Sequence, residues 1–145
     1  MVVDQNFLKV KKYFLLVIFF LLFASKSYSN NYTFTKIIEL DEPWGSSFIN
    51  NDEIIITEKS GKIKIVNVVS KEVTEIKHNL NFLEVGQGGL LDIIHQDNTL
   101  WISYSEDRGN LKTSTSIAKA QLNKQELNFK NIFQANPPID SGYHF

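Results

Sequence analysis

Beyond residue 30, apolar and polar residues alternate in short runs that polar or glycine-containing turns separate. Alternation with a period of two is typical of β-strands that bury one face. The first runs predict strands over residues 32–40, 46–49, 53–58, 62–66 and 73–76, and the last four of these form a four-stranded meander. In the strand over 62–66, Lys62 and Lys64 alternate with isoleucines, so we expect both lysines to face solvent.

The second half of the chain repeats this order. It predicts strands over residues 89–94, 99–105, 114–122 and 127–134. Leu100, Ile102 and Tyr104 alternate with more polar neighbours and should form the buried face of their strand. Residues 106–110 read as a solvated polar turn. No stretch beyond residue 30 has a long helical apolar period, so the sequence predicts an all-β fold.

Three tight turns each lead toward a short apolar strand, and they are marked by Trp44, Gln87 and His144. Their separations are 43 and 57 residues, which is the range expected for the blades of a β-propeller. The chain therefore predicts about two four-stranded blades and the start of a third. Because a propeller needs at least about four blades, we expect the front part of a longer protein, in which the strand over 32–40 completes the last blade.

The leading segment carries an export pattern. Three lysines precede an unbroken apolar run over residues 13–24, and small residues at Ser27 and Ser29 follow it. Twelve apolar residues are fewer than the roughly 20 that a stable membrane span needs, so this pattern predicts a signal peptide over residues 1–29. An uncleaved N-terminal anchor is the alternative, since Lys26 lies within the cleavage region. The chain has no cysteine, which agrees with a bacterial periplasmic or secreted protein stabilised by packing alone.

Charge narrows the class of partner. The first 29 residues hold four of the 15 basic and one of the 16 acidic side chains, so the remainder has a net charge near −4. A nucleic-acid surface would show clustered Lys and Arg, whereas the remainder has a single arginine, Arg108. We therefore expect a small neutral or polar substrate and no nucleic acid.

Motifs along residues 30–145 resemble, in order, those of the glucose/sorbosone dehydrogenase family of soluble, pyrroloquinoline quinone (PQQ)-dependent sugar dehydrogenases. The residues that carry the resemblance are Pro43-Trp44-Gly45, Thr57-Glu58-x-x-Gly61, Gly86-Gln87-Gly88-Gly89-Leu90-Leu91-Asp92, Ser103-Tyr104-Ser105-Glu106 and Ser141-Gly142-x-His144-Phe145. The run of glycines around Gln87 is the most specific of these motifs. The resemblance implies a six-bladed propeller that binds PQQ across one end of its axis, with calcium supporting the site.

The resemblance also implies residue roles. His144 would be the general base that takes the proton from the anomeric hydroxyl of an aldose, while the C1 hydride passes to PQQ and a lactone forms. Gln87 would contact cofactor and substrate. An external electron acceptor would reoxidise the cofactor, and a homodimer is an open possibility. Most groups that clamp PQQ and calcium in the family would lie beyond Phe145, and Tyr143 departs from the small or acidic residue expected beside the base.

The residue chemistry agrees with these roles without requiring them. A neutral imidazole titrates near the working pH and suits a base, and an amide offers both a donor and an acceptor. Gln87 could instead only satisfy backbone groups of its turn. We interpret His95 as a hydrogen-bonded strand-end residue, His78 as a loop residue and Asp92 as a structural acceptor. The competing functions are an exported propeller that binds a ligand or partner without catalysis, and an inactive truncated product.

Overall fold

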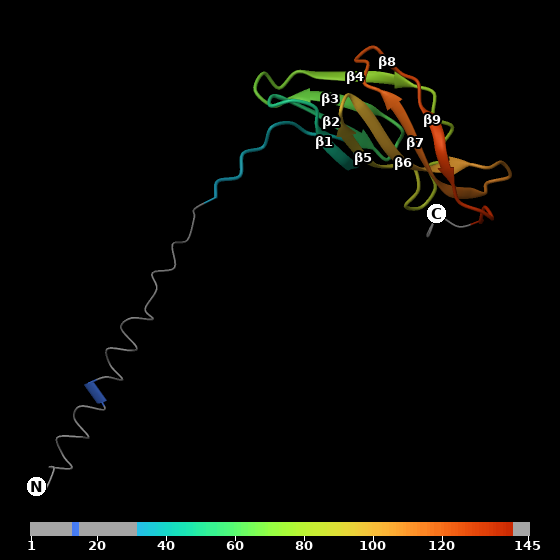
Figure 1. Ribbon diagram of the computed structural model, residues 1–145, viewed down its shortest axis with the longest axis horizontal. Helices are drawn as coiled ribbons and strands as arrows, with labels where there is room; N and C mark the ends of the chain where they lie inside the picture. Colours follow the sequence, from blue (N-terminus) through green and yellow to red (C-terminus); the bar gives the residue numbers. More distant parts are fainter. Residues whose placement is uncertain (1–12, 15–31, 141–145) are drawn as a thin grey trace, which may run out of the picture. The chain divides into compact units, whose positions relative to one another are not determined.

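The computed structural model describes residues 13–14 and 32–140 (Figure 1). Tyr13 and Phe14 are helical and exposed, and they belong to a different compact unit from the strands, which lie in the unit that begins at Lys36. Apart from these two residues, the expected signal peptide lies outside the described residues, as does the third turn over 141–145. Among the described residues, no helix has the length and apolar character to cross a membrane.

Two sheets account for the fold, and each is built on a four-stranded antiparallel meander (Figure 1). The strand orders are β1-β2-β3-β4-β8 and β5-β6-β7-β9. The first contains β1 (Pro43–Phe48), β2 (Glu53–Glu58), β3 (Ile63–Asn67) and β4 (Val73–His78). The second contains β5 (Leu90–Gln96), β6 (Thr99–Asp107), β7 (Thr113–Gln121) and β9 (Lys130–Gln134). Both predicted four-stranded meanders are thereby confirmed, and β2 has the predicted bounds.

The last predicted strand, over residues 127–134, is wrong as a single element. It divides into β8 (Glu126–Leu127) and β9, and β8 leaves its own sheet to pair in parallel with β4 of the first sheet. Asn79 extends this link, since its side chain accepts a hydrogen bond from the Phe129 amide at 2.8 Å and donates to the Phe129 carbonyl at 3.1 Å. Leu127 is fully buried, so burial of this side chain between the sheets outweighs continuation of the strand.

The core lies between the two sheets and takes one face from each. Leu100, Ile102 and Tyr104 are at most 2% exposed, which confirms the predicted alternation along β6. The residues of this core are Ile55, Ile63, Ile65, Ile76, Leu90, Ile93, Leu100, Ile102, Tyr104, Ala118, Ala120, Leu127 and Phe129. Each fully buried isoleucine or leucine contributes about 1.5–3 kcal/mol relative to exposure.

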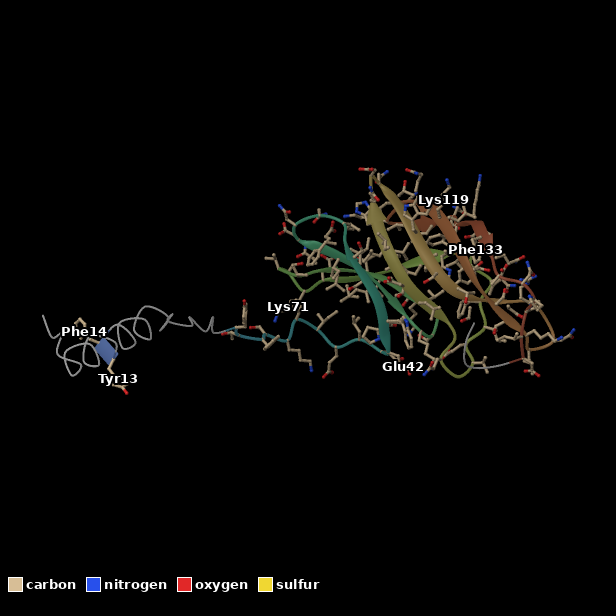
Figure 2. All side chains as sticks on the ribbon, turned by 60° about the horizontal axis from the view of Figure 1, so that its bottom comes forward. Tyr13, Phe14, Glu42, Lys71, Lys119 and Phe133 are labelled. Carbon is tan, nitrogen blue, oxygen red and sulfur yellow. The ribbon has the colours of Figure 1, made fainter. Side chains whose placement is uncertain are left out.

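The opposite face of the second sheet is open among the described residues. Ile94, Trp101 and Phe133 are 55%, 37% and 53% exposed. The Lys119 ammonium lies 5.5 Å from the centre of the Trp101 ring. Figure 2 labels Lys119 and Phe133 on this sheet, well separated from Glu42, which directly precedes β1. Blades of a propeller pack on neighbours through both faces, and this is the face that a following blade would cover.

The predicted strand over residues 32–40 is absent. These residues form no strand, and Tyr32 and Phe34 are 79% and 96% exposed. Alternation alone does not make a strand, because its backbone groups need a partner ladder. No described strand pairs with this segment, which leaves its expected role in a last blade untested.

The prediction that the Lys64 side chain faces solvent is wrong. Its side chain is 16% exposed, and its ammonium lies 2.7 Å from Oε1 of the fully buried Glu58. It lies on β3 directly opposite Ile56, on the face of the first sheet that points away from the core. That face is not simply solvated, because the buried carboxylate at the end of β2 provides a partner for the lysine.

Candidate active site

The turn that carries Gln87 joins the two sheets between β4 and β5. The Gly88 amide donates to the Val85 carbonyl at 2.8 Å and closes the turn. Gly86 and Gly89 have φ angles of 57° and 142°, a region that glycine occupies without strain. Gly88 and Gly89 are buried whereas Gln87 is exposed. The turn therefore presents the Gln87 amide outward on a buried glycine base.

Close approach of neighbouring groups explains these glycines. A Cβ at Gly89 would lie 2.1 Å from the carbonyl oxygen of Lys59, in the turn between β2 and β3 of the first sheet. A Cβ at Gly88 would lie 2.9 Å from Oγ of Ser105 on β6. The Leu90 amide donates to the same Lys59 carbonyl at 3.3 Å. Gln87 is therefore held where the first sheet meets the second.

The Trp44-Gly45 motif also lies at this junction. A Cβ at Gly45 would come within 2.6 Å of the Asp92 Cα on β5. The buried Thr57 hydroxyl accepts from the Gly45 amide at 3.0 Å and donates to the Leu91 carbonyl at 2.5 Å. Trp44 is 50% exposed. The motif thus brings the two inner strands, β1 and β5, into direct contact.

Two segments form backbone hydrogen bonds with the end of the β6–β7 hairpin: the loop that carries Gln87 and the segment that leads toward His144. On β6, the Ser105 amide donates to the Gly89 carbonyl at 2.9 Å, and the Asp107 amide donates to the Asn81 carbonyl at 3.1 Å. On β7, Thr113 and Ile139 exchange two backbone hydrogen bonds of 2.9 Å. Since Thr113 pairs with Asp107, the Gln87 loop and the segment that leads toward His144 are fixed at the same end of this hairpin.

The predictions for the three histidines compare differently with the structure. His144 lies outside the described residues, so its role stays a prediction. His78 is not a loop residue: it ends β4, its Nε2 lies 2.6 Å from the Gly61 carbonyl, and its Nδ1 accepts from the Leu80 amide at 3.2 Å. These partners assign the proton to Nε2. His95 bonds through its backbone amide to Ser47 Oγ at 3.0 Å, but its buried Nε2 has no partner among the described residues.

Asp92 has the structural part that we expected. Its Oδ1 accepts from the Ile93 amide at 2.9 Å, next to the position where Gly45 approaches its Cα. Among the described residues, no group of three or more His, Cys, Asp or Glu side chains is placed to hold a metal ion. The described part of the chain therefore offers Asp92 as a backbone acceptor, and calcium binding remains a prediction.

Glu58 is a buried charge that sequence reasoning did not single out as structural. Burial by itself favours a higher pKa for this carboxyl, but hydrogen bonds from Lys64 and the Asp41 amide outweigh it and hold the pKa below its ordinary value. Those bonds are 2.7 and 2.9 Å long, and both go to Oε1. Glu58 directly precedes Lys59, so the ion pair with Lys64 stabilises the β2–β3 turn whose Lys59 carbonyl contacts Gly89.

Glu106 is also not the solvated turn residue that the sequence suggested. It lies within β6, where its Oε2 accepts from Ser116 Oγ and Gln134 Nε2 at 2.5 Å each and its Oε1 accepts from Asn131 Nδ2 at 3.1 Å. Asn131 in turn accepts from the Tyr104 hydroxyl at 2.7 Å. Burial raises the pKa of Tyr104. The period of two from Leu100 through Tyr104 continues to position 106 and could have revealed this placement.

Two cations near this end of the blades already have protein partners. The Arg108 guanidinium donates to neutral acceptors of Ser114, Ala135 and Asn136, and the Lys59 ammonium lies 3.7 Å from the Glu42 carboxylate. Lys112, on the β6–β7 hairpin, is exposed. Of the described residues, the resemblance assigns a role to Gln87, and that role stays a prediction, so the described residues do not form a complete PQQ site.

Two four-stranded meanders that share a core and attach their loops at one end are consecutive blades of a β-propeller. Residues 40–145 match the Glucose / Sorbosone dehydrogenase family, and the chain belongs to that family. The expected resemblance and fold class are thereby confirmed.

Two curated relatives match most of the chain. Aldose sugar dehydrogenase YliI of Escherichia coli (strain K12) is 27% identical over 116 residues, which cover 74% of this chain and 31% of the relative. An uncharacterised protein of Synechocystis sp. is 29% identical over 121 residues, which cover 73% and 29%. The chain thus spans about a third of the length of these relatives.

Solved structures show the same likeness. The apo form of the soluble aldose sugar dehydrogenase from Escherichia coli superposes with a TM-score of 0.62 at 26% identity, over 68% of this chain and 31% of that one. The PQQ-bound aldose sugar dehydrogenase from Streptomyces coelicolor gives 0.59 at 17% identity, over 68% and 32%. The second likeness shows the fold alone.

Proposed function

We propose that the protein to which this chain belongs is an exported, PQQ-dependent aldose sugar dehydrogenase. Membership of the Glucose / Sorbosone dehydrogenase family and the name of the Escherichia coli relative support oxidation of a sugar. The family resemblance implies PQQ as the cofactor, and the aldose sugar dehydrogenase from Streptomyces coelicolor is a PQQ-bound protein of the same fold. Bound PQQ would accept the hydride of the substrate, because such chemistry belongs to the cofactor and not to the side chains.

The observation that carries the proposal is the exposed Gln87 on its buried glycine turn, fixed at the same hairpin end as the segment that leads to His144. Gln87 can donate to and accept from a sugar hydroxyl without adding charge. His144 would hold the proton of the anomeric hydroxyl on a ring nitrogen. Calcium and an external electron acceptor complete the proposal, with export to the periplasm or medium after removal of residues 1–29.

The test uses the full-length protein, supplied with PQQ and Ca²⁺, and dye-coupled oxidation of an aldose. We expect activity only when both are added, and we expect His144→Gln to reduce kcat on the order of 10²–10⁴-fold, the usual contribution of a positioned base. His95→Gln is the matched control, since it removes a histidine on β5 to which the resemblance assigns no role, and it should retain activity. Activity of His144→Gln equal to that of the control would exclude the assigned base.

A non-catalytic binding propeller is the second candidate, and the engagement of Arg108 and Lys59 by protein groups favours it. PQQ affinity separates the two candidates, because a binding propeller would show no PQQ-dependent change in absorbance or in thermal midpoint. The intact mass of the mature protein from its source tests the remaining part of the proposal. A mass near that of residues 30–145 alone would favour the truncated, inactive product.

A further inference from the structure

The turn over residues 59–61, between β2 and β3, contacts the start of the loop that carries Gln87. This loop joins β4 to β5 over residues 79–89. Directly before it, His78 ends β4, and its Nε2 lies 2.6 Å from the Gly61 carbonyl oxygen. Because a carbonyl oxygen only accepts hydrogen bonds, Nε2 carries the proton and donates to this turn.

The first residues of the loop hold the His78 ring in this orientation. The Leu80 amide donates to Nδ1 at 3.2 Å, so both ring nitrogens have a protein partner. The Phe82 ring lies 6.1 Å from the imidazole ring, centre to centre. An ideal Cβ at Gly61 would lie 1.9 Å from Cζ of Phe82, so this ring packs directly on Gly61 beside the hydrogen bond from His78.

The same turn contacts the other end of the loop. The Lys59 carbonyl oxygen accepts from the Leu90 amide at 3.3 Å and lies 2.1 Å from an ideal Cβ of Gly89. Lys59 and Gly61 belong to one short turn, which closes where the Gly61 amide donates to the Glu58 carbonyl at 3.0 Å. A shift of Gly61 would therefore also move the Lys59 carbonyl, against which the glycine-rich part of the loop is packed.

We propose that His78 is a positioning residue for Gln87 and that it acts through the turn over residues 59–61. Its Nε2–H holds the Gly61 carbonyl, the turn in consequence fixes the Lys59 carbonyl, and this carbonyl sets the place of the glycines beneath Gln87. The kinetic consequence rests on the proposed function, which gives Gln87 its contact with cofactor and substrate. The structural consequence can be measured without catalysis.

Two amide side chains distinguish the two ring nitrogens of His78. The amide nitrogen of a glutamine reaches about as far as Nε2 and donates, whereas the shorter asparagine reaches only about as far as Nδ1. His78→Gln therefore keeps a donor for the Gly61 carbonyl, and His78→Asn removes it. Lys77→Asn is the matched control, since it places the same residue at the neighbouring, exposed position of β4.

Hydrogen exchange of the full-length protein, followed by mass spectrometry, gives the structural readout. In His78→Asn we expect the amides over residues 84–90 to exchange about 3- to 10-fold faster, as the loss of one hydrogen bond implies. Those of β6 and β7 should stay unchanged, and His78→Gln and Lys77→Asn should match the wild type. Unchanged exchange over residues 84–90 in His78→Asn, equal acceleration in His78→Gln, or acceleration throughout both sheets would overturn the proposal.

A measurement on the wild type covers the case in which His78→Asn does not fold. The NMR signals of the His78 ring nitrogens, assigned by comparison with His78→Gln, report which nitrogen of the neutral ring carries the proton. We expect the proton on Nε2. A proton on Nδ1 would leave Nε2 unable to donate to the Gly61 carbonyl and would overturn the proposal.

Kinetics with PQQ and an aldose give the second readout, and a Gln87→Ala background tests whether His78 acts through Gln87. We expect His78→Asn to lower kcat/KM on the order of 10-fold when Gln87 is present, as misplacement of a substrate contact does. In Gln87→Ala the same change should have little further effect. No loss, or equal losses in both backgrounds, would overturn the proposal. If the wild type has no activity, the proposed function fails, and hydrogen exchange still decides the role of His78.

Discussion

The carbonyl oxygen of Lys59 occupies the place where a side chain at position 89 would begin, 2.1 Å from the ideal Cβ of Gly89. Lys59 belongs to the first blade and Gly89 to the second. Their contact is therefore part of the junction between the blades, and the Leu90 amide adds a hydrogen bond to the same oxygen. The turn that presents Gln87 exists in this form because the residue two positions later has no side chain.

Gly89→Ala tests this contact. The methyl group would meet a backbone atom that cannot rotate away, so we expect a loss of roughly 3 kcal/mol or more in the free energy of unfolding, measured with urea. Gly109→Ala is the matched control. Gly109 also has a positive φ, of 77°, but no atom lies within 4 Å of its Cβ. It should lose only about 1–2 kcal/mol from backbone strain. Equal losses would show that φ, and not the Lys59 contact, requires glycine at 89.

The sequence predicted part of this fold. Period-two patterns located both meanders, because a strand with one buried face alternates apolar and polar residues. The pairing of strands could not be predicted in the same way. Residues 32–40 alternate but find no partner among the described strands, and Leu127 pairs with the first sheet instead of its own. Which strand a segment joins depends on three-dimensional neighbours that local periodicity does not encode.

The candidate site was likewise predicted only in part. The exposure of Gln87 agrees with the cofactor and substrate contact that the resemblance implies for it, and the glycines around it allow the tight turn that presents this side chain. The polar network around Glu106 and the ion pair of Glu58 and Lys64 were missed, because charged residues in a strand are ordinarily solvated. Their burial depends on partners 10–28 and 6 residues away. The role of His144 remains a prediction.

The pair formed by Glu58 and Lys64 predicts a characteristic dependence on pH. Lys64→Met should lower the free energy of unfolding at pH 7 by about 3–5 kcal/mol, because it leaves a fully buried carboxylate without its counter-charge. Lys77→Met, on the neighbouring strand β4 and exposed, is the matched control and should change it by less than about 0.5 kcal/mol. Equal losses in the two variants would contradict a specific ion pair.

The sign of the pH effect separates the wild type from Lys64→Met. In the wild type the pKa of Glu58 is lowered on folding, so its contribution is present above the unfolded value of about 4.3 and is lost as the pH falls below it. In the variant, burial without the ammonium should raise that pKa instead. The loss of unfolding free energy caused by the unpaired Glu58 carboxylate is then largest at neutral pH and disappears as Glu58 becomes protonated. The difference in unfolding free energy should therefore shrink between pH 7 and pH 4.

Lys124 and Glu53 form an ion pair between the two blades, with the ammonium 2.6 and 2.7 Å from the carboxylate oxygens. The hydrogen bond from Lys124 is the main reason that the pKa of Glu53 is lowered. The lysine side chain is 54% exposed, so we expect Lys124→Met to cost only about 0.5 kcal/mol at low salt. At 1 M NaCl the difference from wild type should vanish, because the Debye length is then about 3 Å. A loss that persists at 1 M NaCl would point to packing by the lysine stem.

Glu106 provides the sharpest test of the network inside the second blade. All three of its side-chain partners donate to it, from Ser116, Asn131 and Gln134. Glu106→Gln keeps the shape but replaces one acceptor oxygen by an NH₂ group that faces a donor, so we expect a loss of about 1–3 kcal/mol in urea unfolding. Asp107→Asn is the matched control, since among the described residues Asp107 Oδ1 accepts from the Gly109 amide alone, at 2.8 Å, and asparagine preserves that acceptor. Similar stability of the two variants would mean that Glu106 behaves as a solvated turn residue after all.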